Sequence, residues 1–304
     1  MFPAEVIPAG LLVDRLIGDP DSRYHPVAWL GRYIGWWGRP CLWKPGFGKS
    51  VGILMWTGTI VLFALPFFLF SIFAPWYLYL IIAPFLLKIC LAWRSLEEHM
   101  ERVVEAVESN LDEGRDRVSM MVSRDSRELS HEEVLSAGYE SMSENLVDSI
   151  ISPLFYFGVG GLTGAAVYRA ANTMDAMLGY KDERKDLGWW PARMDDVLNY
   201  IPARVAGCLL LLYFACKGTF HQAWQSLLED GKKRPGYNGG IPMAIMAGGT
   251  GTVFEKPGVY RIGPGERSLE IAGPEIFSAV RVVTLVFAGL LIAAVLLLQV
   301  LLIM

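Results

Sequence analysis

Long apolar runs divide this chain, and three of them are long enough to cross a membrane. Val51–Phe73 and Trp76–Trp93 are separated only by a short uncharged link, so they predict a helical hairpin. Phe277–Met304 is the third run and is rich in Leu, Val and Ile. Because a helix needs about 20 apolar residues to span a bilayer, all three are predicted transmembrane helices.

Three further apolar stretches are less regular. Met1–Ile17 predicts a short helix that inserts only in part. Ile150–Ala171 is long enough to span, but glycines between positions 158 and 164 interrupt it, and Val205–Cys216 is short. The last two can be full spans or half-helices that enter the bilayer and return, since irregular backbone is tolerated at membrane depth where protein surrounds it.

The distribution of basic residues favours a broken or re-entrant helix for Ile150–Ala171. Six Lys and Arg residues precede position 51, which predicts a cytoplasmic start. A single crossing by Ile150–Ala171 would place the basic loop 181–193 outside and would separate Asp175 and Asp196 from Glu144. A re-entrant path keeps these carboxylates together on the cytoplasmic side. The predicted fold class is therefore all-α, a polytopic integral membrane protein with broken or re-entrant helices.

Composition agrees with a membrane location. Of the 304 residues, 53% are hydrophobic and 19% are charged, whereas soluble domains carry about a quarter charged residues. The mean hydropathy is +0.35. A net charge of −4 gives no reason to expect nucleic acid as a partner. The four cysteines form no CxxC pair, which argues against a disulfide framework or a zinc site.

The whole chain, 1–304, is predicted to form one membrane-embedded domain. Its parts are the transmembrane hairpin 51–93, a polar catalytic region 94–204, an ordered glycine-rich cytoplasmic loop 231–273 and the C-terminal transmembrane helix 277–304. Loops as long as 231–273 are usually functional or disordered. Gly46–Ser50 is similar to a phosphate-binding P-loop, but Trp43 stands where that motif begins with glycine, so the segment is interpreted as a membrane flank.

Ionisable residues at helical spacing mark the candidate site. Glu140, Glu144 and Asp148 recur every four residues, with Asn145 beside them, so they line one helix face. Charges in or beside a bilayer cost on the order of a few kcal/mol unless they are paired or solvated, which makes them candidates for function. Carboxylate oxygens are ligands that suit Mg²⁺. The alternative is a solvated helix face.

Two more polar clusters follow. Tyr168, Asn172 and Asp175 align on one helix face with Arg169 adjacent, and the planar fork of an arginine suits carboxylate or phosphate. The alternative for Arg169 is an ion pair with Asp175 that only holds the helix in register. The third cluster comprises Arg193, Asp195, Asp196, Asn199 and Arg204.

Outside these clusters, two segments suggest ligand contacts. Successive glycines at Gly248–Gly251 can present backbone N–H groups to an anion, and Lys256, with Glu255 and Tyr260 nearby, would add charge. The alternative is a flexible turn. His25 follows a Gly-Asp-Pro turn and is a candidate for proton transfer because its pKa lies near neutrality, although a structural hydrogen bond is its alternative.

Taken in order, these segments resemble the cobinamide-phosphate synthase family of cobalamin biosynthesis, the CbiB/CobD family. The match covers most of the chain. Two positions depart from the family pattern, Met142 and Pro191, and neither replaces a polar site residue. The motifs that carry the resemblance are Asp14, Gly18-Asp19-Pro20, His25-Pro26-Val27, Ser123-Arg124-Asp125, Glu140–Asp148, Pro153-Leu154-Phe155, Tyr168–Asp175, Gly179-Tyr180, Ala192–Arg204 and Glu255–Tyr260.

The resemblance implies an ATP-dependent, amide-forming ligase in the cell membrane that joins adenosylcobyric acid, a corrinoid, to (R)-1-amino-2-propanol or its O-phosphate. It also implies ATP and Mg²⁺ as co-reactants, the lipid bilayer as surroundings, and a homo-oligomer or other corrinoid-pathway enzymes as partners. The residues expected to act in catalysis are His25, Glu140, Glu144, Asn145, Asp175, Asp195 and Asp196. Those expected to bind metal are Glu144, Asp148 and Asp196. Those expected to bind cofactor or substrate are Arg124, Arg169, Asn172, Arg193, Asn199, Arg204, Glu255, Lys256 and Tyr260.

Two other classes of function compete with this one. A non-catalytic sensory or regulatory membrane protein on the same scaffold is expected to lose part of the polar set, which this chain retains. A transporter with a midplane site between broken helices is expected to show inverted repeats, and we find none in the sequence.

Overall fold

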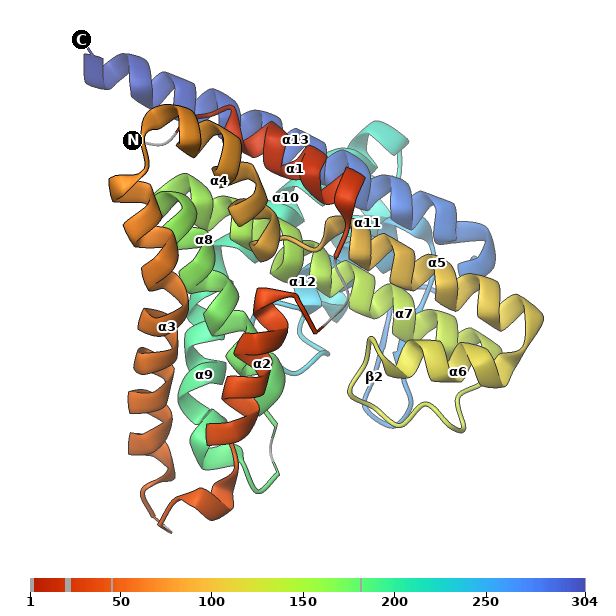
Figure 1. Ribbon diagram of the computed structural model, residues 1–304. Coiled ribbons are helices and arrows are strands. Elements are labelled where there is room, and N and C mark those ends of the chain that lie inside the picture. Colours follow the sequence, from red (N-terminus) through yellow and green to blue (C-terminus); the bar gives the residue numbers. More distant parts are fainter. Residues whose placement is uncertain (1–2, 20–22, 45, 181, 304) are drawn as a thin grey trace. The chain divides into compact units, whose positions relative to one another are not determined.

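Helices dominate the computed structural model, which describes residues 3–19, 23–44, 46–180 and 182–303 (Figure 1). The prediction of an all-α polytopic membrane protein is confirmed, and one small β-hairpin is the exception among the described residues. The bent pair Trp76–Cys90 and Trp93–Ser109 adds a fifth candidate span to four that are long and apolar enough to cross a membrane on their own. Those four are Gly48–Phe73, His131–Leu178, Tyr200–Lys217 and Leu269–Leu302.

The chain groups into two compact units, and the first consists of residues 1–92, 152–199 and 288–304. In it, α3 packs along both α8 and α9, while α1 packs on α4 (Figure 1). The helices of this unit are α1 (Val6–Ile17), α2 (Pro26–Trp37), the short η1 (Pro40–Leu42), α3 (Gly48–Phe73), α4 (Trp76–Cys90), α8 (Ser152–Leu178) and α9 (Lys185–Leu198).

Small residues explain how closely α3 approaches α9. A Cβ atom on Gly52 would lie 2.4 Å from the Leu187 carbonyl oxygen, and one on Gly48 would lie 2.7 Å from the Asp186 side chain. These contacts exclude any larger residue without a shift of one helix. The glycines at the start of α3 therefore serve helix packing, as the interpretation of Gly46–Ser50 as a membrane flank predicts.

Helix α8 reverses direction at Gly160 and Gly161, whose backbone leaves the helical region. The rings of Tyr156 and Tyr168 stack at 5.4 Å, although twelve residues of straight helix would separate them by about 18 Å. The helical run that enters the reversal is unbroken from His131 to Gly160, about 45 Å, and the arm that returns to Leu178 is about 27 Å long. The predicted broken helix is confirmed, and it is a helical hairpin.

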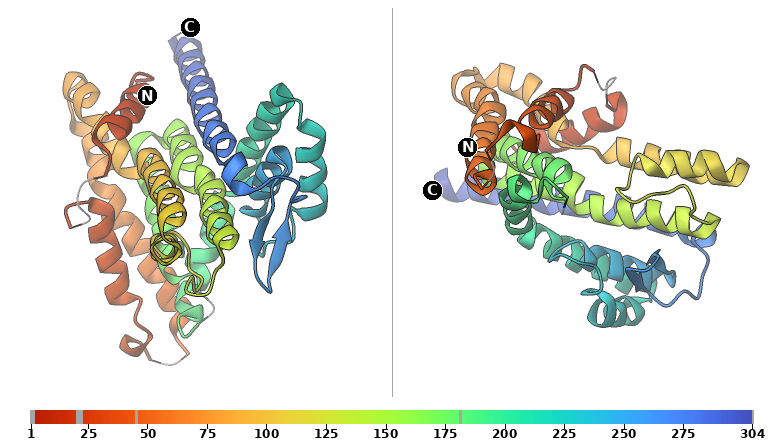
Figure 2. Two further views of the ribbon diagram at one scale, coloured as in Figure 1. Left: turned by 90° about the vertical axis from the view of Figure 1, so that its right-hand side faces the viewer. Right: turned by 90° about the horizontal axis from the view of Figure 1, so that it is seen from below.

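The second unit consists of residues 93–151 and 200–287. Helix α7 packs on α5 and on the β-hairpin, while α10, α11 and α12 form one group, coloured turquoise to light blue (Figure 2). Helix α13 (Leu269–Ile303) begins in this unit and ends in the first. The other elements are α5 (Trp93–Ser109), α6 (Leu111–Ser119), α7 (His131–Leu146), the π-turn η2 (Val147–Ile151), α10 (Tyr200–Lys217), α11 (Phe220–Asp230), α12 (Gly240–Thr250), β1 (Phe254–Lys256) and β2 (Tyr260–Ile262).

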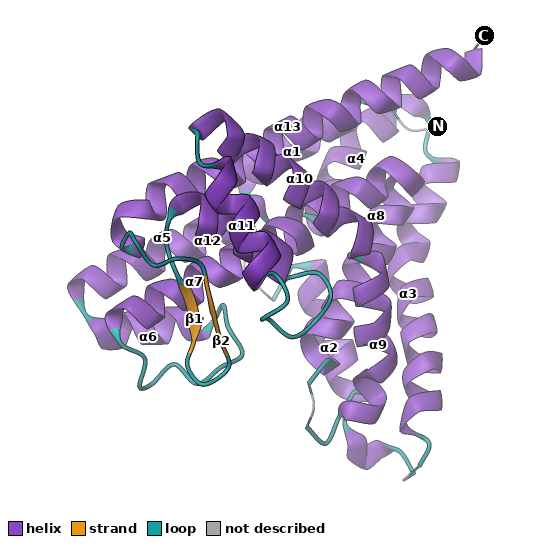
Figure 3. Ribbon diagram, turned by 180° about the vertical axis from the view of Figure 1, so that it is seen from behind, coloured by secondary structure: helices purple, strands orange, loops and turns teal. Residues whose placement is uncertain are grey.

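The prediction of a long loop over 231–273 is wrong. This segment contains the buried helix α12 and the antiparallel hairpin β1–β2, which is orange in Figure 3. The predicted anion cradle at Gly248–Gly251 is wrong for the same reason. A Cβ on Gly249 would lie 2.4 Å from the Phe214 ring, and one on Gly248 would lie 2.4 Å from Ser226. These glycines let α12 pack closely on α10 and α11.

Candidate functional site

A polar cavity of about 300 Å³ lies in the second unit. Helix α7 forms one wall, the segment after α6 another, and the β-hairpin and the segment before α12 complete it. Its lining combines three cations with two carboxylates and a phenol, and those six residues are Arg124, Glu140, Glu144, Arg234, Lys256 and Tyr260.

Glu140 is the best-bonded carboxylate in this cavity and is only 5% exposed. Its Oε1 accepts hydrogen bonds from Arg124 Nη2 at 2.9 Å and from Ser136 Oγ at 2.8 Å, while its Oε2 accepts from the Tyr260 hydroxyl at 2.6 Å. Burial and the Glu140 charge raise the pKa of Tyr260, which keeps that hydroxyl protonated as a donor. Glu140 therefore ties the β-hairpin to α7 and fixes one wall of the cavity.

The backbone of the hairpin takes part in the same network. Arg124 Nη1 donates to the Glu255 carbonyl oxygen at 3.1 Å, and the Glu255 N–H donates to Ser136 Oγ at 2.7 Å. The Glu255 side chain instead faces Arg261, its partner across the hairpin, at 3.7 Å. Of the predicted binding residues on the hairpin, Lys256 and Tyr260 face the cavity, while Glu255 contributes its backbone.

Glu144 lies one helical turn beyond Glu140 and forms an ion pair with Arg234. Burial lowers the pKa of the Arg234 guanidinium, but the charge and hydrogen bond of Glu144, together with Tyr260 and Asp148, raise it overall. Arg234 therefore lies beside the helix face on which Glu140, Glu144 and Asp148 were predicted to lie. Asn145 has a different task, because its amide donates to the Ser141 carbonyl oxygen at 2.9 Å and its carbonyl accepts from Ser149 Oγ at 2.8 Å.

Arg204 lies apart from this cavity lining, at the start of α10. It donates to Asn238 Oδ1 at 3.0 Å and to the Tyr200 carbonyl oxygen at 2.7 Å. Its guanidinium also covers the Tyr200 ring at 3.4 Å. These contacts give Arg204 a structural role that the sequence did not indicate.

A second polar cluster joins α8 to α9 in the first unit. Asp195 accepts hydrogen bonds from Asn172 Nδ2 at 3.2 Å and from Asn199 Nδ2 at 2.9 Å. Asn199 Oδ1 in turn accepts from Tyr168 at 2.8 Å and from Ser152 at 2.6 Å. The predicted helical faces 168–175 and 195–199 therefore meet, and Asn199 is almost fully buried between them.

Three carboxylates gather in this cluster. Burial and then the charges of Asp175 and Asp196 together raise the pKa of Asp195 to about 7, although the hydrogen bonds from Asn172 and Asn199 act in the opposite direction. Such mutual repulsion is relieved by a cation. Arg193, on the same helix, is exposed to solvent.

The donor set fits Mg²⁺ only in part. Among the described residues, no group of three His, Cys, Asp or Glu side chains is placed to hold a metal ion alone. Mg²⁺ is usually held by one or two carboxylates and shares its other positions with water and phosphate. Pairs of carboxylates such as Asp195 and Asp196, or Glu144 and Asp148, suit that mode of binding.

His25 occupies the N-cap of α2. Its Nδ1 accepts a hydrogen bond from the Val27 N–H at 3.2 Å, which leaves Nε2 to carry the proton. That nitrogen lies 3.5 Å from Asp19 Oδ1, and Lys88 forms an ion pair with the same carboxylate. Pro20, the last residue of the Gly-Asp-Pro turn, lies outside the described residues.

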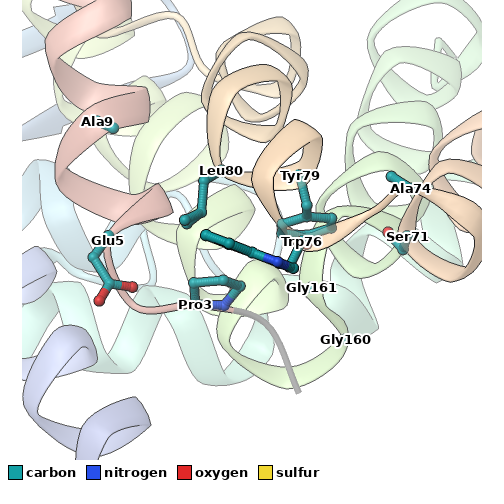
Figure 4. Close-up of a pocket in the computed structure, with 10 residues that line it drawn as sticks. All are labelled: Pro3, Glu5, Ala9, Ser71, Ala74, Trp76, Tyr79, Leu80, Gly160 and Gly161. Carbon is teal, nitrogen blue, oxygen red and sulfur yellow. The ribbon is translucent and has the colours of Figure 1, made fainter.

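A larger apolar cavity of about 730 Å³ lies where α3 joins α4 (Figure 4). Trp76, Tyr79 and Leu80 form one side, and Gly160 and Gly161 at the reversal of α8 form another. Its described lining includes none of the predicted site residues, so the candidate chemistry belongs to the polar clusters.

Sequence reasoning missed two charged residues of these clusters. Arg234 follows two lysines in a segment predicted to be loop, and that basic run was a usable signal. Lys88 is a single cation inside an apolar stretch, which is also a recognised signal of function. Neither residue was predicted to belong to a site, because the carboxylates with which they pair are distant in the sequence.

Comparisons with known proteins agree with the resemblance. The family model described as "CobD/Cbib protein" matches residues 7–283. A "Probable cobalamin biosynthesis protein CobD" from Thermococcus kodakarensis is 40% identical over 288 residues, which cover 94% of this chain and 92% of that protein. Proteins with the same name from Methanothermobacter thermautotrophicus and Pyrococcus abyssi are 38% and 39% identical over 86% and 87% of this chain, covering 88% and 87% of their own lengths. No solved structure gives a significant match.

Proposed function

The chain belongs to the CobD/CbiB family of cobalamin biosynthesis proteins, and we propose that it is the ligase that joins adenosylcobyric acid to (R)-1-amino-2-propanol or its O-phosphate at the expense of ATP. The product is adenosylcobinamide or its phosphate. The observation that carries the proposal is the polar cavity, in which Arg124, Arg234 and Lys256 surround two glutamates.

The chemistry explains why such a site suits this reaction. A carboxylate does not react with an amine until it is converted into a better acyl donor. We propose that a carboxylate oxygen of cobyric acid attacks the terminal phosphorus of ATP, which forms an acyl phosphate and releases ADP. The amine nitrogen then attacks the acyl carbon, the C–O bond to phosphate breaks, and an amide and inorganic phosphate result.

Each step makes a demand that this chain can meet. Negative charge develops on phosphate oxygens, and arginine and lysine stabilise it best where water is partly excluded. Mg²⁺, when bound at the carboxylate pairs, would supply further charge neutralisation. The attacking amine must also lose a proton, which a carboxylate near it must accept. We further propose that the protein resides in the cytoplasmic membrane with these groups on the cytoplasmic side.

The direct test is turnover by the purified protein in lipid nanodiscs. Adenosylcobyric acid, ATP and Mg²⁺ are supplied with either aminopropanol or its phosphate, and ADP is counted per corrinoid amide formed. We expect one ADP per amide, and loss of activity in both Glu144→Gln and Asp196→Asn. The matched control is Glu113→Gln, which removes an exposed carboxylate paired with Arg117 on α6.

Two results would contradict parts of this proposal. If Glu144→Gln and Asp196→Asn both ligate at the wild-type rate, the site is misplaced. If the wild-type protein turns over neither amine under any condition, a non-catalytic sensory function explains the protein better than a ligase does.

A further inference from the structure

Lys88 is a buried cation inside an otherwise apolar helix. It lies in the last turn of α4, where Leu87 and Cys90 are fully buried, and it is itself 5% exposed. Its ammonium group pairs with Asp19, just beyond the end of α1. A buried lysine is costly unless it is paired, and in a membrane protein such a group is a candidate for function.

The surroundings of Asp19 carry an excess of nitrogen donors. His25 Nε2 faces the same Asp19 oxygen at 3.5 Å. Burial lowers the pKa of His25, the Asp19 charge opposes that change, and the charges of Lys88 and Arg169 lower the pKa further. Arg169, on α8, therefore lies within electrostatic range of the group. Two permanent cations therefore act on the neutral imidazole beside the Asp19 carboxylate.

Two of these donors have no acceptor among the residues that the structure describes. His25 Nε2 and Arg169 Nε are buried atoms, and neither has a hydrogen-bond partner among the described residues. His25 Nε2 carries the proton, because Nδ1 already accepts from the Val27 N–H. Buried N–H groups in proteins are nearly always satisfied, so two unsatisfied donors in one charged cluster call for an acceptor that the described residues do not provide.

We propose that His25, Lys88 and Arg169 form an oxyanion site in the first unit that binds a phosphate group. A tetrahedral phosphate has enough acceptor oxygens for the Arg169 fork, the imidazole N–H and the Lys88 ammonium together. Asp19 holds Lys88 in place and balances its charge when the site is empty. The source of the phosphate rests on the proposed function, whose candidates are ATP and the amine phosphate.

Binding can be tested without turnover. The protein is placed in phosphatidylcholine nanodiscs, which carry no anionic lipid, and dissociation constants for three probes are measured by calorimetry. The probes are inorganic phosphate, the Mg²⁺ complex of AMP-PNP and O-phosphoethanolamine. We expect Lys88→Met and Arg169→Ala each to raise the dissociation constant of at least one probe by about tenfold or more, since each removes a charge-assisted hydrogen bond. The probe whose affinity falls identifies the source of the phosphate group.

Control variants separate binding from folding. Lys49→Met removes an exposed lysine of α3 in the same unit and should leave all three affinities unchanged. Lys88→Met leaves the Asp19 charge without its cation, so the double variant Asp19→Asn/Lys88→Met is the folding control. It should remain folded and should still bind the probes weakly. Lys88→Arg should recover most of the affinity.

The outcomes distinguish this inference from the proposed function. If the Asp19→Asn/Lys88→Met and Arg169→Ala variants are folded and bind every probe as tightly as wild type, the oxyanion site is wrong, even if the protein ligates. If those variants lose binding while the wild-type protein makes no amide, the site stands and the proposed function fails.

Discussion

The stability of this protein should depend on pH through the carboxyl group of Asp195. Its folded pKa of about 7 lies above its ordinary value of 3.8. The protonated form is therefore favoured by folding, and its contribution to stability is complete below about pH 4 and is lost as the pH rises through 7. Asp195→Asn keeps the shape of the neutral group and does not ionise.

We therefore expect the melting temperature of Asp195→Asn, relative to wild type, to rise between pH 4 and pH 7 and then to level off. The difference should reach a few degrees, because about 1 kcal/mol moves the melting temperature of a chain of this size by roughly 2–4 °C. Thermal unfolding in metal-free buffer across this range measures it. A difference that does not change with pH would show that Asp195 is ionised throughout.

Tyr260 offers a second test at the scale of one atom. Tyr260→Phe removes the hydroxyl that donates to Glu140 Oε2 at 2.6 Å and leaves that buried oxygen without this donor. A hydrogen bond to a charged group contributes about 1.5–3 kcal/mol, so we expect a loss of that order in the free energy of unfolding. Tyr237→Phe is the control, since Tyr237 is 63% exposed, and it should unfold like wild type.

At the residue scale, the sequence correctly predicts neighbours on one helix, but it does not predict pairs between elements that are far apart in the chain. The i,i+4 rule correctly placed Asp195 with Asn199 and Tyr168 with Asn172, because helix geometry alone decides those neighbours. The Glu144–Arg234 pair joins residues 90 positions apart. Such a pairing depends on how whole elements pack, which residue types at local spacing do not determine.

At the scale of elements, the reversal of α8 depends on one backbone conformation. Gly161 has φ of 60° and ψ of −150°, a region that residues with a Cβ avoid. We expect Gly161→Ala to cost about 1–3 kcal/mol, measured by denaturant or thermal unfolding in detergent. Gly160→Ala is a close control, because Gly160 has φ of −133° and a Cβ there would contact nothing within 4 Å. Equal stability of the two variants would contradict this account.

The same element scale shows where glycine misleads. Glycines at 158–164 correctly indicated a break in a helix, whereas those at 248–251 suggested a loop and instead belong to the end of the buried helix α12. Glycine permits unusual backbone angles and also close packing, and only the neighbouring helix decides which is used. In α12 the neighbour is Phe214 of α10, far earlier in the chain.

At the scale of the whole molecule, the charge of the loops predicts which side of the membrane each of them faces. Length and hydropathy identify four spans, or five with the bent pair, but they do not orient them. The positive-inside bias predicts that the loop between α8 and α9 is cytoplasmic and that the α3–α4 turn is external. The hairpin shape of α8 is consistent with this, because the arm after Gly161 runs back toward the side from which the first arm enters.

Cysteine labelling in intact cells tests that orientation. The exposed Cys41, Cys208 and Cys216 are first replaced by serine, whereas the buried Cys90 is retained. Single cysteines are then introduced at Glu183, between α8 and α9, and at Phe73, which is 76% exposed at the end of α3. We expect a membrane-impermeant maleimide to label position 73 from outside and to reach position 183 only after the cells are opened.

The pair of positions makes the result decisive, because each serves as the control for the other. Labelling of 183 from outside with 73 protected would invert the topology and place the α8–α9 carboxylates outside the cell. A corrinoid ligase that consumes cytoplasmic ATP would then be excluded at that cluster. Labelling of both positions from outside would instead mean that α8 does cross the membrane, so the reversal at Gly160 and Gly161 would have to open into one continuous helix.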